Sequence, residues 1–197
     1  YFLHRLYHRL PFFWRFHQVH HTDMDLDVTS ASRFHLGEVL SSAIPKFAAV
    51  ALLGISPVGL VTFEVALLLA AQFQHANIRV PLSWERWLWR TFVPPAMHRV
   101  HHRPTRADAD SNFGTLLTLW DRMFGTLRLV ATEAESFGLP EFREPVKLGV
   151  LKILALPFAI AARPGAKTDS RTPAERSTVN RSERGVGAAG QAELPGQ

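Results

Sequence analysis

The sequence predicts an all-α integral membrane protein, built from a helical hairpin in the membrane and a histidine-rich helical cap. Hydrophobic residues make up 47% of the chain, with 14 Phe and 5 Trp, while charged residues still reach 20%. This balance suits a membrane protein with a polar part. A long apolar stretch over residues 39–73 is divided by one turn-like segment. Histidines also recur at spacings that place them on one face of a helix.

The chain of 197 residues is long enough for one domain with a sizeable core and too short for two comfortable ones. We assign this domain to residues 1–162. Residues 163–197 lose all aromatic and nearly all large aliphatic residues, so we expect a disordered tail. The chain begins with Tyr1 rather than Met, and its first ten residues carry His and Arg, unlike a secretory signal. We therefore expect N-terminal membrane helices to be missing from it.

The first 22 residues predict two short helices. Proline is tolerated in the first turn of a helix and pushes the residue before it out of the helical region. We therefore expect one helix to end near Leu10 and another to run from Pro11 to about Thr22. Aromatic residues alternate here with arginines, which is typical of helices at a membrane interface.

Residues 39–73 predict a helical hairpin, with its turn at residues 54–57. Each arm is expected to have about 16 or 17 residues, roughly 24–26 Å of helix, slightly less than the ~30 Å hydrocarbon core. Only Lys46 and Glu64 interrupt the apolar arms. A buried hairpin of a soluble protein is the alternative interpretation.

Arginines flank the hairpin on both sides, while its tip carries no charge. By the positive-inside rule both flanks are cytoplasmic, so the segments before and after the hairpin can share one face of the membrane, which we expect to be the bacterial inner membrane. The arginines are Arg5, Arg9, Arg15 and Arg33 before it and Arg79, Arg86, Arg90, Arg99, Arg103 and Arg106 after it.

Trp84, Trp87 and Trp89 lie among arginines, as in a helix at the level of the lipid headgroups. A nucleic-acid platform also mixes arginine with aromatic residues, but it would not accompany a hairpin of lipid length. We interpret the net charge of +5 as a feature that attracts an anionic membrane surface, and we expect no nucleic-acid partner. Residues 146–162 form one more apolar stretch that predicts a helix packed on the membrane or on the cap.

Eight of the ten histidines form three clusters, one HxxxH and two HxxHH. Positions i, i+3 and i+4 share a helix face, so each triple is expected to direct three imidazoles at one point. Eight imidazoles exceed what one ion can use, which indicates two metal ions. Because the chain has no cysteine, the ligands must be imidazole or oxygen. The predicted ligands are His4, His8, His17, His20, His21, His98, His101 and His102.

Two single histidines and several acidic residues are further candidates. His75 follows the second arm of the hairpin and can reach the same face, so we count it as a ligand, and His35 as a possible one. Asp110 and Asn112 are the candidates to hold the outer N–H of ligating imidazoles and so fix their orientation. Acidic residues at 23, 27, 38 and 108 could do the same or could be solvated.

These segments resemble the fatty acid hydroxylase and sterol desaturase superfamily of integral membrane oxygenases, over roughly residues 1–127. The boxes and the 75–81 segment look most like its bacterial branch, which also resembles alkylglycerol monooxygenase. The resemblance is carried by HRLYH at 4–8, HQVHH at 17–21, RFH at 33–35 with Glu38, HANIRVP at 75–81, HRVHH at 98–102, NFG at 112–114 and WDRMFGT at 120–126.

The resemblance implies a di-iron enzyme that uses O₂ to hydroxylate or desaturate a lipid-like substrate, with zinc able to occupy the same ligands. The sequence has no GxGxxG fingerprint and no cysteine for an iron–sulfur centre, so the electrons must come from a cytochrome- or ferredoxin-type donor. A basic cap would suit an acidic donor.

Two other functions stay open: a histidine-rich membrane metal-binding or transport protein, and an inactive fragment of the oxygenase. Transport calls for ionisable residues deep within spanning helices, where this sequence has only Lys46 and Glu64. The sequence does not choose among hydroxylation, desaturation and ether cleavage.

Overall fold

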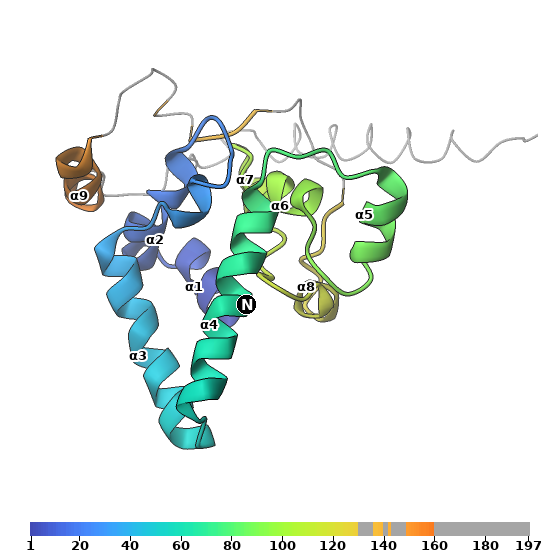
Figure 1. The fold of residues 1–197 in the computed structure, drawn as a ribbon. Helices are drawn as coiled ribbons and strands as arrows, with labels where there is room; N and C mark the ends of the chain where they lie inside the picture. Colours follow the sequence, from blue (N-terminus) through green and yellow to red (C-terminus); the bar gives the residue numbers. More distant parts are fainter. Residues whose placement is uncertain (130–135, 140–141, 143–148, 160–197) are drawn as a thin grey trace, which may run out of the picture. The chain divides into compact units, whose positions relative to one another are not determined.

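The computed structural model describes residues 1–129, 136–139, 142 and 149–159, and the regular elements among them are helices (Figure 1). Within them the only extended pairing is an isolated bridge between Phe92 and Leu117. The prediction of a disordered tail at 163–197 falls outside the described residues. The helices are α1 (Phe2–Arg9), α2 (Pro11–His17), η1 (His20–Thr22), η2 (Ser30–Ser32), α3 (Leu36–Leu53), α4 (Pro57–His75), α5 (Leu82–Leu88), α6 (Pro95–His101), α7 (Arg106–Ala109), α8 (Leu119–Met123) and α9 (Val150–Ala159).

The first two helices divide at Pro11, as expected. Leu10 is extended, with φ −98° and ψ 123°, and Pro11 occupies the first turn of α2. The second helix is shorter than predicted, because α2 ends at His17 and a separate 3₁₀ turn, η1, carries His20 to Thr22. In that turn both the backbone N–H and the hydroxyl of Thr22 donate to the carbonyl of Val19. This change of helix type alters the directions in which the first HxxHH box points its rings.

Helices α3 and α4 form the predicted hairpin, and both are long and apolar enough to cross a membrane. With 18 and 19 residues, they are about 27 and 28 Å long. Gly54 ends α3 in the left-handed conformation, with φ 64°, which glycine adopts without strain. Ser56 caps the start of α4 by accepting from the N–H of Gly59. The hairpin prediction is therefore confirmed, with arms slightly longer than expected.

The arms expose almost all of their apolar side chains. Their buried residues are Glu38, Gln74 and His75, all at the cap end. Leu52 and Val58, near the turn, are 85% and 76% exposed. A hairpin in the core of a soluble protein would bury such residues. A lipid environment accounts for their exposure.

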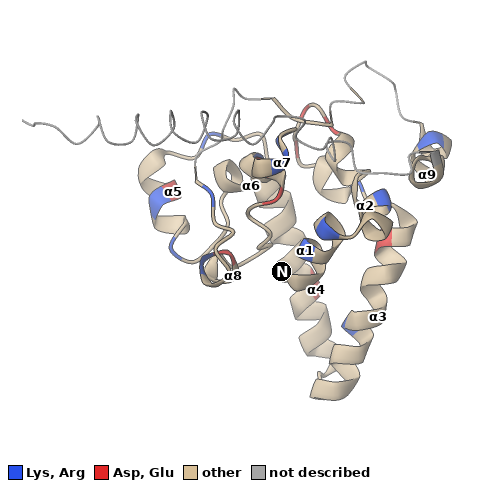
Figure 2. Ribbon diagram, turned by 180° about the vertical axis from the view of Figure 1, so that it is seen from behind, with Lys and Arg blue, Asp and Glu red and all other residues tan. Residues whose placement is uncertain are grey.

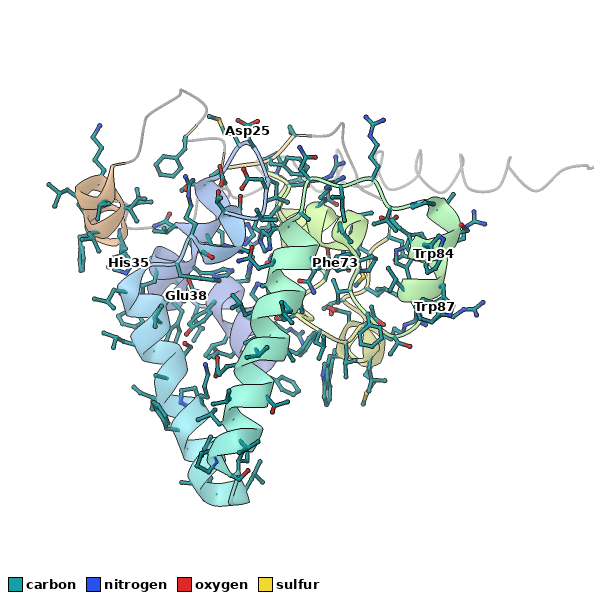
Figure 3. The ribbon with its side chains drawn as sticks, viewed as in Figure 1. Asp25, His35, Glu38, Phe73, Trp84 and Trp87 are labelled. Atoms are coloured by element: carbon teal, nitrogen blue, oxygen red, sulfur yellow. The ribbon has the colours of Figure 1, made fainter. Side chains whose placement is uncertain are left out.

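Charges are nearly absent from the hairpin and gather on the cap (Figure 2). The two charged residues in the middle of the arms neutralise each other, since Lys46 Nζ lies 2.6 Å from Glu64 Oε1. On the cap, Trp84 and Trp87 of α5 are 64% and 59% exposed (Figure 3). The position of α5 at headgroup level stays a prediction.

The cap packs against the ends of both arms. Helix α2 contacts α3, and helix α6 contacts α4. The largest fully buried side chains include Trp14, Phe113 and Met97, together with several histidines. The core of the cap is therefore built around imidazole rings rather than around aliphatic residues.

Candidate metal centre

Nine of the ten histidines gather in two adjacent clusters, which we call cluster 1 and cluster 2. Within each cluster the candidate ligand atoms lie within 4.8 Å of one another. All these residues are buried except His4, which is half-buried. Cluster 1 consists of His4, His8, His17, His21 and His101, and cluster 2 of His20, His75, His98 and His102.

Each HxxHH box is divided between the two clusters. In both boxes the first and last histidines belong to one cluster and the middle histidine to the other. The expectation that a box directs three imidazoles at one point was therefore wrong. On an ideal helix residues i+3 and i+4 differ by about 100° in direction, enough to send them to neighbouring sites. The exchanged residues are His20, which joins the histidines that follow the hairpin, and His101, which joins those that precede it.

Cluster 2 has the spacing of ligands that share one ion. The Nε2 atom of His75 lies 3.2 Å from the Nε2 atoms of His20, His98 and His102. The Nε2 atoms of His98 and His102 are 3.1 Å apart. Nitrogen ligands at ~2.1 Å from an ion are separated by about 3.0 Å at right angles and about 3.4 Å in a tetrahedron.

The outer hydrogen bond of His75 also favours an ion. Its Nδ1 lies 2.7 Å from the carbonyl oxygen of Ala71, so Nδ1 carries the proton and donates it. Nε2 then presents a lone pair toward three other imidazole nitrogens. A cation at this point satisfies all four rings together, whereas hydrogen bonds among them cannot.

The rings of cluster 1 are oriented in the same way. The Nδ1 atoms of His4 and His101 donate to the carbonyl oxygens of Phe113 and Ser111, at 2.9 and 2.7 Å. His17 Nδ1 donates to Glu38 Oε1 at 2.7 Å. Among the described residues, the buried Nε2 atoms of His4 and His17 have no hydrogen-bond partner. The lone pairs of these atoms are therefore available to a metal.

Burial keeps these imidazoles in the form that binds metals. Removal from water lowers the pKa values of buried histidines in both clusters well below their usual 6.5, and the neighbouring imidazoles lower them further. The rings are therefore neutral near pH 7, as a ligand must be. The affected residues are His4, His20, His21, His98 and His102.

Two carboxylates support cluster 1 from outside. Glu38, at the cap end of α3 (Figure 3), fixes His17. Asp121 is fully buried and accepts from the N–H groups of Phe113 and Gly114, both at 2.8 Å. It thus holds the peptide whose carbonyl accepts from His4. Sequence reasoning considered Glu38 without preferring it and missed Asp121, although both lie within the motifs that carried the family resemblance.

Asp110 and Asn112, which we predicted to hold the outer N–H of imidazoles, differ in their contacts. Asp110 Oδ1 lies 4.0 Å from His8 Nδ1, while its other oxygen accepts from Arg106. The amide of Asn112 instead bonds the backbone, donating to the carbonyl of Met97 and accepting from the N–H of Arg128. Its φ of 52° suits a turn residue. Asn112 therefore shapes the loop and does not bond an imidazole.

His35 lies in neither cluster. Its Nδ1 accepts from the N–H of Gly37 at 2.8 Å and so caps the start of α3. Its Nε2 lies 3.3 Å from the carbonyl oxygen of Leu154 in α9. The possible ligand role of His35 has no support, because both ring nitrogens face backbone groups.

Comparison with known proteins finds a family model, described as fatty acid hydroxylase, that matches residues 1–126. An ornithine lipid hydroxylase of Rhizobium tropici is 31% identical over 175 residues, covering 83% of this chain and 48% of that protein. Human alkylglycerol monooxygenase is 28% identical over 179 residues, covering 84% and 36%. Human cholesterol 25-hydroxylase is 29% identical over 134 residues, covering 66% and 47%. The chain spans about half or less of the length of these curated relatives, and no solved structure matches it.

Proposed function

The chain belongs to the fatty acid hydroxylase family, and from this premise we propose that it is a membrane-bound di-iron oxygenase acting on a lipid. The observation that carries the proposal is the pair of buried clusters, which together offer nine imidazoles and no thiolate. Such ligands suit iron and equally zinc. The family, not the ligand type, selects iron.

When bound, two iron ions would supply the redox chemistry with which O₂ attacks a C–H bond. The residues of this chain would hold the ions, orient the imidazole rings and shield the site from water. The five imidazoles of cluster 1 and the four of cluster 2 would hold one ion each. Glu38 and the carbonyls of Ala71, Phe113 and Ser111 keep the outer protons in place. Buried aromatic rings around cluster 1 exclude water.

The substrate class is proposed from the relatives, whose names specify an ornithine lipid, an alkylglycerol and cholesterol. All are lipids, and the exposed apolar arms of the hairpin would place the centre beside the bilayer. Whether the product is a hydroxylated, desaturated or cleaved lipid depends on which substrate carbon is held against the centre. The domain at 1–162 would carry this activity, in the bacterial inner membrane with the cap on the cytoplasmic side.

Electrons would come from a cytochrome- or ferredoxin-type donor that docks on the cap. Arg86 and Arg90 are exposed there and offer positive charge to an acidic partner. A metal-transport function has less support, because the clusters lie in the cap and at its junction with α4. In the middle of the arms, the charged residues are Lys46 and Glu64, which are bound to each other.

Metal analysis of the full-length protein, purified without oxygen, tests the proposal. We expect about two irons per chain and, in vesicles with a reducing system and O₂, a lipid whose mass rises by one oxygen or falls by two hydrogens. His35→Asn is the matched control, because this histidine lies outside both clusters and asparagine also caps helices. One tightly bound zinc that survives replacement of cluster histidines would refute it.

A further inference from the structure

The two clusters differ in how they are shielded from the surroundings. The aromatic rings that pack on cluster 1 are Tyr7, Trp14 and Phe113, which are only 3%, 2% and 0% exposed. The aromatic ring that packs on cluster 2 from outside the histidines is Phe34, which is 42% exposed. Among the described residues, cluster 2 is therefore the one in contact with an exposed ring.

Phe34 links the surface to cluster 2 by one stacking contact. Its ring lies 4.9 Å from that of His20, centre to centre, with the planes only 11° apart. The Nε2 atom of His20 is in turn 3.2 Å from that of His75. A molecule that touches Phe34 is thus separated from the His20 ring by the thickness of one ring.

The surroundings of Phe34 are apolar and continuous with the hairpin. Leu36, two residues on, begins α3 and is 57% exposed. On the other arm, Gln72 of α4 donates to the hydroxyl of Ser32, two residues before Phe34. Leu69 lies three residues before Gln72 on the same helix face and is 64% exposed, and Phe73 lies one turn after Leu69 and is 37% exposed. The segment around Phe34 therefore leads into α3 and also contacts α4.

Charge next to Phe34 is neutralised. The neighbouring Arg33 pairs with Asp23, with 3.6 Å between Nη1 and Oδ1. An acidic protein partner would find no free positive charge in this pair, whereas a hydrocarbon chain needs none. Apolar exposure next to lipid-length helices matches the chemistry of an acyl or alkyl chain.

We propose that Phe34, Leu36, Leu69 and Phe73 form a lipid access surface, through which the hydrocarbon chain of a membrane lipid reaches cluster 2 from the bilayer. The inference rests on the proposed function for its meaning, because it names the side from which the substrate meets the centre. Cluster 2 is then the substrate-facing site, and cluster 1 is the enclosed one. Phe34 determines how closely a chain approaches His20.

The natural chain has no cysteine, so single cysteines can be labelled without a background. The fluorophore NBD, which is sensitive to its environment, is attached to the single cysteine of Phe34→Cys, Phe73→Cys or Leu36→Cys. Each labelled protein is loaded with zinc and placed in lipid nanodiscs. Arg106→Cys, at an exposed residue of helix α7, is the aqueous control. Lipids with nitroxide-labelled chains quench the fluorophore from the bilayer, and iodide quenches it from water.

We expect nitroxide lipids to quench positions 34 and 73 as strongly as position 36, with iodide quenching only position 106. Iodide quenching at 34 and 73 would overturn the proposal and make this surface a water-facing one. Absence of quenching by both agents at 34 and 73 would overturn it as well, because the surface would then be covered by protein. Position 73 keeps the test valid if the Phe34→Cys variant does not fold.

Metal content is measured on the same samples. It tests the proposed function, whereas quenching tests the lipid access surface, so either can be refuted without the other. Protein that binds no metal but shows lipid quenching would refute the proposed function and leave the lipid contact standing. Protein that binds two ions and shows iodide quenching would refute the lipid access surface alone. The zinc content of the labelled variants also shows whether loss of the Phe34 ring disturbs His20.

Discussion

Because each box gives its middle histidine to the other cluster, His20→Ala and His101→Ala should weaken metal binding to different extents. His20→Ala removes one of the four imidazoles of cluster 2, leaving three. His101→Ala removes one of the five imidazoles of cluster 1, leaving four. Both residues are the middle histidine of an HxxHH box and both are buried, at 3% and 0% exposure. If each HxxHH box held one ion by itself, the two substitutions should weaken metal binding equally.

The magnitude follows from the number of ligands that remain. Four-ligand protein sites bind zinc with about 10–16 kcal/mol, or roughly 2.5–4 kcal/mol per ligand. His20→Ala should therefore weaken cluster 2 by about 10²–10³-fold, since 1.36 kcal/mol corresponds to tenfold. His101→Ala leaves a complete set of four, so the loss at cluster 1 should be about tenfold or less.

The assay is metal content after dialysis against a chelator whose affinity lies between the two expected values. His20→Ala should keep one ion per chain, and His101→Ala should keep two. His35→Asn should match the unchanged protein, and circular dichroism should confirm that all variants are folded. Loss of both ions in either variant, or equal retention in both, would refute the division of the boxes between two sites.

Three further outcomes are expected. Glu38→Gln removes the charge that polarises the His17 imidazole and should weaken metal binding at cluster 1 by about 10- to 100-fold. Glu85→Gln, buried to a similar degree in α5, should change nothing, and equal effects in metal titrations would contradict this role. Asp121→Asn leaves a buried N–H without its acceptor and should lower the free energy of unfolding by about 1–3 kcal/mol in denaturant titrations, and an unchanged midpoint would count against it. Burial lowers histidine pKa values below 6.5 in the folded state, so the metal-free protein is stabilised fully above pH 6.5 and loses this stabilisation as the pH falls. Its Tm should therefore decline below pH 6.5, and a constant Tm would show that the rings are hydrated without metal.

The hairpin and the histidines of the two clusters could be predicted from the sequence because their signals are local. Residues 39–73 are apolar throughout, and Gly54 and Pro57 mark the turn. The histidine boxes are short repeated patterns that can be read without knowing the fold. His75 was predicted from its place after the second arm, and the structure puts it in the middle of cluster 2.

The partition into two sites could not be predicted from the spacing, because residues i+3 and i+4 differ by about 100° in direction and the fold decides whether both face one ion. Both boxes divide in the same way, although α2 stops at His17 while α6 continues to His101. The role of Glu38 depends on a contact with a residue 21 positions away. Conversely, Asn112 had the right position in sequence, but its positive φ turns the amide toward the backbone.

The crosswise sharing of histidines changes how the protein acquires its ions during folding. Either ion joins the segment before the hairpin to the segment after it, because each cluster contains residues of both. In an unfolded cap, bringing the two segments together costs chain entropy, which grows slowly with the length of the flexible chain between them. The first ion to bind bears this cost, and the second finds the loop already closed. Metal loading should therefore be cooperative, and the half-loaded chain should be scarce.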